Sequence, residues 1–250
     1  MNFDAVMPAL LLLLFLSAVT VGGGMGLLIF RVVARHRARS EFPPQPSLES
    51  LYPSTCASYL RRPASWLAIK SRSVMAVQSA LGLHNPKPCS WTEGLAGEDK
   101  LFIAPPVKGW ILVIGSGLPD PAEDVDACFR FLLNLSRRLG DVQFFSASKV
   151  VHHHAWARLE AGRVLRAYAW AGRTLWKQGL RTAAEKELGL TCPEYADSND
   201  LSSFCPPEAM AANAEKVPLL AARWSLDPAE VDERFLQHER GIAGEPSRRY

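Results

Sequence analysis

The sequence lacks the cysteine patterns that mark a disulfide framework or a zinc site. Its 250 residues include five cysteines, an odd number, and no two of them are spaced as C-x-x-C. They are Cys56, Cys89, Cys128, Cys192 and Cys205. Disulfide frameworks use an even set of cysteines, and zinc sites use closely spaced pairs of Cys or His. We therefore expect reduced thiols, as in cytosolic proteins, and the sequence indicates no cofactor.

A concentration of basic residues is missing from the main body of the chain. The net charge is +3, residues 1–30 hold only the charge of Asp4, and residues 31–62 contain six arginines and two glutamates, so residues 63–250 are neutral. A domain that binds nucleic acid carries its Lys and Arg on the fold itself. The charge distribution therefore predicts no nucleic-acid partner.

Charged residues are also missing from residues 5–30. Within that stretch, residues 9–30 would form a helix of about 33 Å, which is enough to cross a hydrocarbon core of about 30 Å. A cleaved signal peptide would have a basic N-terminus, whereas here the arginines follow the apolar run. The sequence therefore predicts a single-pass protein of the cell membrane, with one uncleaved transmembrane helix at 9–30 and the lipid bilayer as a partner.

The arginines behind the apolar run predict the orientation in the membrane. Basic flanks remain on the cytoplasmic side, so residues 1–8 should lie outside the cell and the C-terminal domain in the cytoplasm. Gly22 and Gly26 form a G-x-x-x-G pattern that would let two such helices dimerise, although glycines are common in transmembrane helices generally. A homodimer is thus one alternative that the sequence leaves open.

Behind the predicted anchor, the composition indicates a linker and one globular domain. Residues 31–64 are basic and then rich in Pro and Ser, which is typical of an extended linker. Apolar periodicity, caps and turn signals predict a domain over residues 65–240, followed by a flexible tail at 241–250. Helices are expected at 65–82, 120–139, 182–189, 207–224 and 228–239, and strands at 101–104, 110–114, 142–146, 151–160, 163–170 and 173–177. The predicted fold class is α+β: an N-terminal transmembrane helix, then one domain with a mostly antiparallel sheet and packed helices.

The helix at 120–139 has the most consistent local signals. Asp120 and Glu123 are spaced as a cap and its returning acid, and Gly140 stands where a helix would end. Apolar residues recur at helical spacing between these two ends. Phe129 and Leu132 lie at the centre of that apolar face, and we expect both to be buried against the sheet.

Several segments resemble a group of uncharacterised bacterial proteins. The shared pattern runs GWILVIGSGLPD, LSRRLGDVQFF, HHHAWARLEAGRVLRAYAWAG and TAAEKELGL between Gly109 and Leu190, with VPLLAARWSLDP near the end. No activity is known for that group, so the resemblance transfers no catalytic residue. It implies a bacterial source and one domain that includes the C-terminal helices.

Three short patterns are similar to functional motifs, but each lacks a part. The G-S-G turn at 115–117 follows a strand as a phosphate-binding turn does, but Asp120 replaces the third glycine and further acids crowd the helix start. Its serine is not part of a G-x-S-x-G elbow. His152 and His154 would share a face of one strand, but no third metal ligand is spaced near them. The sequence therefore predicts no catalytic residue and no metal.

A pair of tryptophans is predicted to share one face of the sheet. Two-residue loops at 161–162 and 171–172 would join three strands as a meander. With that register, Trp156, Ala167 and Trp176 fall in one row. Cross-strand neighbours are about 5 Å apart, so the two indoles would flank a slot floored by alanine.

His154 and Arg158 would extend this face into the neighbouring rows. We expect the surface of Trp156, Trp176, His154 and Arg158 to bind a flat or cationic ligand, or an aromatic anchor from a protein partner. The alternative is that a helix covers this face and that the indoles belong to the core.

These observations predict a non-enzymatic function. The leading interpretation is an interaction or ligand-sensing module, anchored by its N-terminal helix at the cytoplasmic face of a bacterial membrane. The alternative is an enzyme with a poorly marked site near the run from His152 to His154. A deep pocket with converging polar groups would favour the enzyme, and a shallow aromatic surface would favour binding.

Overall fold

A computed structural model describes residues 63–95, 100–148, 153–195, 207–232, 235 and 238–246. The chain divides into two units, Met1–Cys56 and Ala57–Tyr250, and all the described residues belong to the second unit. The sheet and its helices are therefore features of the second unit alone.

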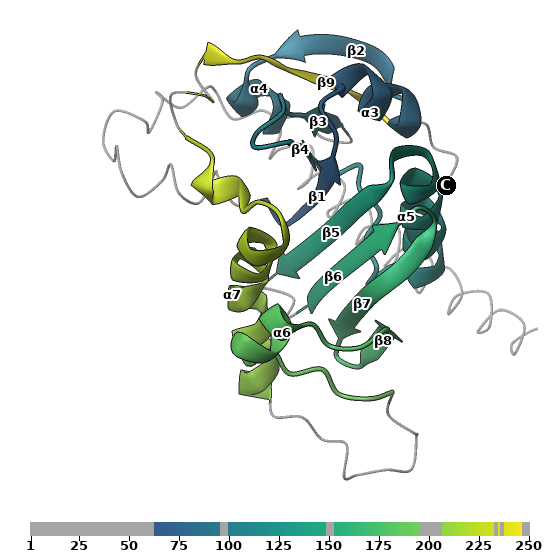
Figure 1. Ribbon diagram of the computed structural model, residues 1–250, viewed down its shortest axis with the longest axis vertical. Coiled ribbons are helices and arrows are strands. Elements are labelled where there is room, and N and C mark those ends of the chain that lie inside the picture. Colours follow the sequence, from purple (N-terminus) through teal and green to yellow (C-terminus); the bar gives the residue numbers. More distant parts are fainter. Residues whose placement is uncertain are drawn as a thin grey trace, which may run out of the picture. The chain divides into compact units, whose positions relative to one another are not determined.

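One antiparallel sheet of nine strands organises the described residues (Figure 1). The strands are β1 (Ser65–Lys70), β2 (His84–Cys89), β3 (Leu101–Ile103), β4 (Trp110–Ile114), β5 (Asp141–Ser148), β6 (His153–Glu160), β7 (Arg163–Ala171), β8 (Thr174–Gln178) and β9 (Gly241–Glu245). Their spatial order is β2-β9-β3-β4-β1-β5-β6-β7-β8, and each neighbouring pair is antiparallel. The helices are α3 (Val74–Leu81), α4 (Trp91–Leu95), α5 (Val125–Leu139), α6 (Ala183–Glu187) and α7 (Pro207–Trp224).

The middle of the sheet combines two interleaved β-α-β units. Strands β1 and β3 flank β4 and are joined through α3, β2 and α4, while β4 and β5 flank β1 and are joined through α5. The order β3-β4-β1-β5 is that of the ferredoxin-like split β-α-β arrangement. Strands β9 and β2 extend it at one edge, and the meander β6-β7-β8 extends it at the other. This arrangement hosts many unrelated functions, so it does not indicate one here.

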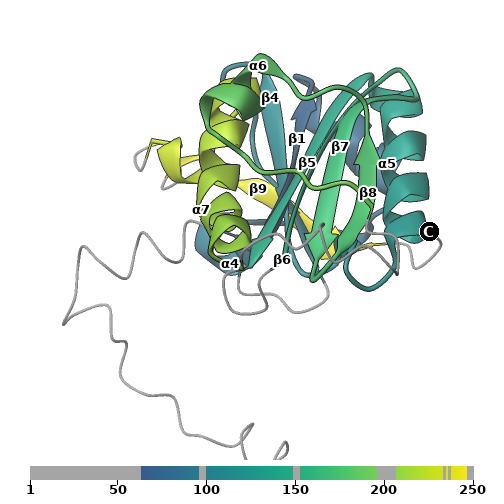
Figure 2. The ribbon, with the colours of Figure 1, turned by 90° about the horizontal axis from the view of Figure 1, so that it is seen from below.

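Helices cover both faces of the sheet (Figure 2). Helices α3 and α5 bury Leu67 and Ile69 of β1 on one side, which we call the α5 face. Helix α7 helps to bury Trp66 and Ala68 on the other side, which we call the α7 face. Because the strand is buried on both sides, its apolar run does not alternate with polar residues.

That unbroken apolar run explains the first wrong prediction. The sequence predicts one helix over residues 65–82, but the segment is strand β1 followed by helix α3. Ser73 caps α3 by accepting a hydrogen bond from the Ala76 N–H, and Gly82 ends it in the left-handed region with φ 62°. A short apolar run cannot be assigned to a strand or a buried helix from periodicity alone.

Helix α5 is confirmed, with a later start. Asp124 is its N-cap and accepts a 2.8 Å hydrogen bond from the Ala127 N–H, while Asp120 closes a turn before the helix. Leu132 is fully buried on the α5 face, as predicted. Phe129 is partly buried against the same cluster.

The meander and two further local predictions agree with the structure. Strands β6, β7 and β8 follow the predicted order, and the first turn, at Ala161-Gly162, is as predicted. The second turn differs, because β7 continues to Ala171 and Trp170 pairs with Thr174 instead of Arg173. Thr182 and Glu185 form the expected capping box at the start of α6, and α7 ends at Trp224 as predicted. The predicted helix at 228–239 is not continuous: a 3₁₀ helix, Pro228–Glu230, ends at Val231, whose backbone is extended.

The predicted flexible tail is wrong for residues 241–245. They form β9, which lies between β2 and β3 inside the sheet. Gly241 allows this close approach, since a Cβ there would lie 2.3 Å from the ring of Phe102. A segment of small residues carries little hydrophobic signal, so its strand pairing is set by its neighbours.

The helices that the structure describes include none long and apolar enough to cross a membrane. The longest of them, α7, has 18 residues and carries charges at Glu208, Glu215, Lys216 and Arg223. The predicted fold class and its single-pass description are therefore corrected to an α+β fold with a large antiparallel sheet. Residues 9–30, predicted to span the membrane, and the glycines at 22 and 26 lie outside the described residues.

Candidate functional site

The two tryptophans of the predicted binding surface lie on opposite faces of the sheet. The hairpin pairs Glu160 with Arg163 as expected, but a bulge between Arg158 and Leu159 shifts the register beyond it. Trp156 therefore stands opposite Tyr168.

A second bulge, between Ala169 and Trp170, places Trp176 opposite Ala169. Trp176 belongs to the core on the α5 face, whereas Trp156 belongs to the core on the α7 face. The predicted row of Trp156, Ala167 and Trp176 is therefore wrong. The one-residue shift between β6 and β7 moves Trp156 to the other face. Trp176 stays on the face of Ala167 but lies two residues further along β7.

Both indoles are core residues. Trp156 is fully buried, and its Nε1 donates a 2.8 Å hydrogen bond to Glu185 Oε1. Trp176 packs edge-on against Phe129, with ring centroids 5.6 Å apart. The slot that the sequence predicted between them does not exist.

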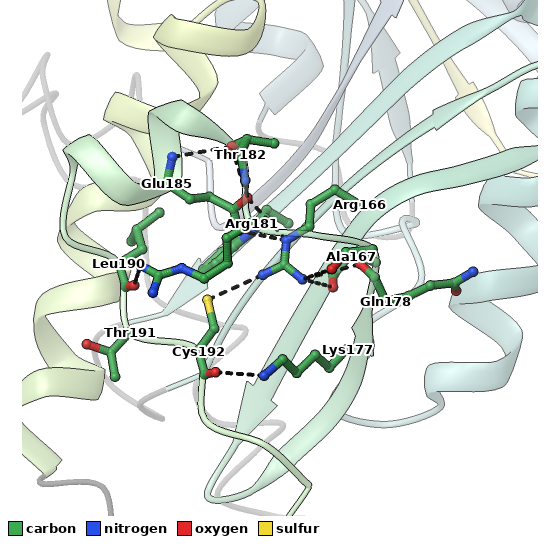
Figure 3. Close-up of polar contacts among 12 residues, drawn as sticks. Arg166, Ala167, Lys177, Gln178, Arg181, Thr182, Glu185, Leu190, Thr191 and Cys192 are labelled. Atoms are coloured by element: carbon green, nitrogen blue, oxygen red, sulfur yellow. Dashed lines mark hydrogen bonds and ion pairs between the residues drawn. The ribbon is translucent and has the colours of Figure 1, made fainter.

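Arg166 and Glu185 form an ion pair buried beneath α6 (Figure 3). Arg166 Nε lies 2.8 Å from Glu185 Oε1, and the two side chains are 1% and 0% exposed. Arg166 also donates to the carbonyl oxygens of Ala167, Gln178 and Gly179. A buried charge needs this density of partners, so the pair is a structural device that attaches α6 to β7.

The chain after α6 is attached to the same strands mainly by polar contacts. Lys177 Nζ donates to the Cys192 carbonyl and pairs with Glu194, and the backbone N–H of Lys177 donates to the Tyr195 hydroxyl. Arg166 Nη2 lies 3.4 Å from Cys192 Sγ. Burial nevertheless raises the pKa of the Cys192 thiol to about 11, so this cysteine is protonated and a poor nucleophile at neutral pH.

His154 is buried in a stack of aromatic rings on the α7 face. Its ring centroid lies 5.7 Å from Trp156, 5.9 Å from Tyr168 and 5.6 Å from Trp170. Burial, with a smaller contribution from the charge of His153, lowers the pKa of His154 to about 4. The imidazole is therefore neutral at neutral pH.

Asn213 defines which nitrogen of His154 carries the proton. Its Oδ1 accepts from the Thr191 N–H and its Nδ2 donates to the Thr191 carbonyl, which fixes the orientation of the amide. The same Nδ2 lies 3.1 Å from His154 Nε2, so Nε2 must accept and Nδ1 must carry the hydrogen.

Arg158, the fourth predicted site residue, belongs to a separate group of polar side chains. Gln143 stands directly across the β5–β6 pair from Arg158, and Asp141 lies two residues before Gln143 on the same face. Arg158 Nη2 and Asp141 Oδ2 are 3.8 Å apart. We call Asp141, Gln143 and Arg158 the polar cluster.

Each member of the polar cluster has a buried polar atom with no hydrogen-bond partner among the described residues. These atoms are Asp141 Oδ1, Gln143 Oε1 and Arg158 Nε. The Arg158 side chain is 38% exposed and that of Asp141 is 14% exposed, whereas Gln143 is completely buried. The cluster thus has a buried floor and a side that faces solvent.

Comparison of the chain with protein-family models, curated proteins and solved structures found no match. The site must therefore be judged on its own geometry.

Of the four residues predicted to form one surface, the structure brings together only His154 and Trp156. Arg158 lies on their face but belongs to the polar cluster, and Trp176 lies on the opposite face. Among the described residues no group of three His, Cys, Asp or Glu is placed to hold a metal ion, and His152 lies outside them.

Sequence reasoning missed Asp141 and Gln143, although a signal was present. In the strand D-V-Q-F-F the two polar residues alternate with Val142, which is buried on the α5 face. Such alternation is typical of a half-buried strand whose polar side faces solvent. The side chain of Gln143 is instead covered, and its Nε2 donates to the Trp224 carbonyl at the end of α7.

Proposed function

We propose that this domain is a non-enzymatic ligand-sensing module and that its ligand binds at the polar cluster. The observation that carries the proposal is the three buried atoms of Asp141, Gln143 and Arg158 that have no partner among the described residues. A buried polar group left unsatisfied costs about 1–3 kcal/mol. Three of them side by side are typical of a place whose partner comes from outside the chain.

The position of the polar cluster supports the same proposal. Gln143 of β5 donates to the carbonyl of Trp224, the last residue of α7, and Arg158 stands directly opposite Arg166 in the next strand pair. Arg166 in turn is paired with Glu185 of α6. A ligand at the cluster would therefore contact strands that hold helices α6 and α7.

A thermal-shift screen of the full chain tests this function. The probes are the twenty amino acids, the common nucleosides and the common monosaccharides. We expect at least one of them to raise the melting temperature, because a ligand that binds only the folded state stabilises it. The stabilisation should disappear in Arg158→Ala.

Arg173→Ala is the matched control, since Arg173 is exposed and lies at the β7–β8 turn. It should respond to the same probe as the unaltered chain. If no probe stabilises the chain, or if the effect persists in Arg158→Ala, the polar cluster is not a ligand site.

A specific contact favours the enzyme alternative as a second candidate. Ser146 Oγ and His153 Nε2 are 3.3 Å apart, close to the histidine run, which is the distance of a serine beside its general base. It ranks second because Ser146 is only 3% exposed, which leaves little access for a substrate carbonyl.

Hydrolysis of p-nitrophenyl acetate by the full chain tests this candidate. An active Ser146–His153 pair predicts turnover that Ser146→Ala abolishes and that Ser148→Ala retains. Equal rates in the unaltered chain and in Ser146→Ala would rule the pair out as catalytic.

A further inference from the structure

We propose that the polar cluster recognises a primary carboxamide group of a small molecule. The inference rests on the proposed ligand-sensing function and names the chemical class of the ligand. It follows from three features of Asp141, Gln143 and Arg158: their free hydrogen-bonding atoms, their placement and their charges.

The free atoms of the cluster require two donors and one acceptor. Asp141 Oδ1 can only accept from a ligand, and Arg158 Nε can only donate to one. The orientation of Gln143 is defined by its Nε2, which donates to the Trp224 carbonyl, so its unpartnered atom is the oxygen. A primary carboxamide has two N–H donors on one nitrogen and one carbonyl acceptor, which matches this set.

The three side chains are neighbours on one face of the sheet, so a single group can approach all of them. Gln143 and Arg158 are direct cross-strand neighbours, about 5 Å apart, and Asp141 is the next residue of β5 on the same face. Gln143 forms the buried floor, and the partly exposed Arg158 lies at the side open to solvent. The ligand carbonyl would face Arg158, and its NH₂ group would lie between Asp141 and Gln143.

The charges disfavour a carboxylate or an ammonium group at this position. Asp141 and Arg158 neutralise each other, so a neutral group adds no net charge to the cluster. A carboxylate would turn an oxygen toward the acceptors of Asp141 and Gln143, and an ammonium would leave Arg158 Nε without an acceptor. Each mismatch leaves a buried polar atom unpaired, which should weaken binding at least about tenfold.

A single ordered water also offers two donors and an acceptor, so the test must separate these two occupants. Matched amide and acid pairs do this: glutamine with glutamate, asparagine with aspartate, and nicotinamide with nicotinate. Calorimetric titration of the full chain measures the dissociation constant of each. We expect at least one amide to bind at least about tenfold more tightly than its acid.

Two substitutions place the preference at the cluster. Gln143→Met removes the accepting oxygen at similar volume, and Arg158→Lys keeps the charge but removes the Nε donor. Each should reduce the preference for amide over acid by about tenfold, whereas Arg173→Lys should leave it unchanged. Circular dichroism of each variant verifies that the chain is folded.

The outcomes separate this inference from the proposed function. If a probe binds the unaltered chain but not Arg158→Ala, and amides bind no more tightly than their acids, the carboxamide assignment is wrong and the ligand-sensing function stands. If no probe binds, and a crystal structure shows only water on the three atoms, both proposals are overturned.

Discussion

At the scale of single residues, the environment of His154 departs strongly from that of a free histidine. A histidine in water titrates near pH 6.5, but this ring lies between three aromatic rings and accepts a hydrogen bond from Asn213. Protonation of Nε2 would bring two donors face to face. The neutral ring therefore helps to hold Asn213, which in turn binds Thr191 of the segment after α6.

This environment predicts a loss of stability in mild acid. The pKa of His154 is about 4 in the folded chain and near 6.5 in the unfolded chain. Between these pH values the unfolded chain is protonated at His154 and the folded chain is not, so protonation favours unfolding. The stabilisation is complete above pH 6.5 and is lost as the pH falls toward 4. It amounts to roughly 3 kcal/mol in the free energy of unfolding.

Urea denaturation at pH 7, 6, 5 and 4 measures this effect. The contribution of His154 is isolated by comparing the unaltered chain with His154→Phe. The free energy of unfolding of this variant should decrease less between pH 7 and pH 4. His84→Gln is the control, because His84 is exposed, and it should follow the unaltered chain. If the free energy of unfolding depends on pH in the same way in His154→Phe and in the unaltered chain, His154 is not the source of the acid sensitivity.

At the scale of elements, α6 depends on one side chain that serves two purposes. Glu185 closes the capping box with Thr182 and also pairs with Arg166 of β7. A helix of five residues has little stability of its own. Its position is therefore determined by this buried carboxylate, which also accepts from the indole of Trp156.

Glu185→Gln should destabilise the chain by about 3–5 kcal/mol, because it leaves the Arg166 charge buried without its partner. Glu187→Gln on the same helix is the matched control. Its side chain is 62% exposed and pairs with Arg223 at the surface, so a change below about 1 kcal/mol is expected. Chemical denaturation of both variants measures the difference, and equal effects would show that the buried pair is not what holds α6.

Helix α5 allows a direct test of core packing. Leu132 is fully buried at its centre, and Leu132→Ala should cost about 2–5 kcal/mol through the cavity it leaves. Arg130→Ala on the exposed side should change the free energy of unfolding by less than about 0.5 kcal/mol. A loss under about 1 kcal/mol for Leu132→Ala would mean that α5 does not pack as described.

At the scale of the whole domain, the last strand in the sequence lies inside the sheet. β9 pairs with β3 on one side and with β2 on the other, so it joins segments more than a hundred residues away. β2 is the edge strand, and β9 is its partner in the sheet. Strand β9 thus completes the part of the sheet that contains β2 and β3, although these strands come much earlier in the sequence.

Ending the chain after Arg240 should therefore destabilise the domain, whereas ending it after Pro246 should not. The first truncation removes β9 and leaves β2 unpaired, a loss we expect to be on the order of 3 kcal/mol, or roughly 6–12 °C in melting temperature. Hydrogen exchange should show faster exchange of the amides of β2 and β3. If the two truncated chains have the same melting temperature, β9 contributes nothing to the stability of the sheet.

Local chemistry was sufficient to predict several parts of this domain from sequence. The turn at Ala161-Gly162, the capping box of Thr182 and Glu185, and the end of α3 at Gly82 depend on residues within a few positions of one another. Such signals are complete in the sequence, because the interacting groups are neighbours along the chain. The antiparallel meander and helix α5 are predicted by signals of this kind.

Only the tertiary structure decided the register of the strands and the burial of Gln143, because both depend on residues far away in sequence. The bulge between β6 and β7 shifts the register of that pair by one residue, and that shift moved Trp156 to the face opposite Trp176. No local pattern marks a bulge, since its position depends on how both faces of the sheet pack against helices. The burial of Gln143 beneath the end of α7 is decided in the same way, because the covering residue lies 81 positions away. Local signals in the sequence therefore determine some elements and turns, such as helix α5 and the turn at Ala161-Gly162. The strands β1 and β9, and the side of the sheet on which each side chain lies, are determined by long-range packing.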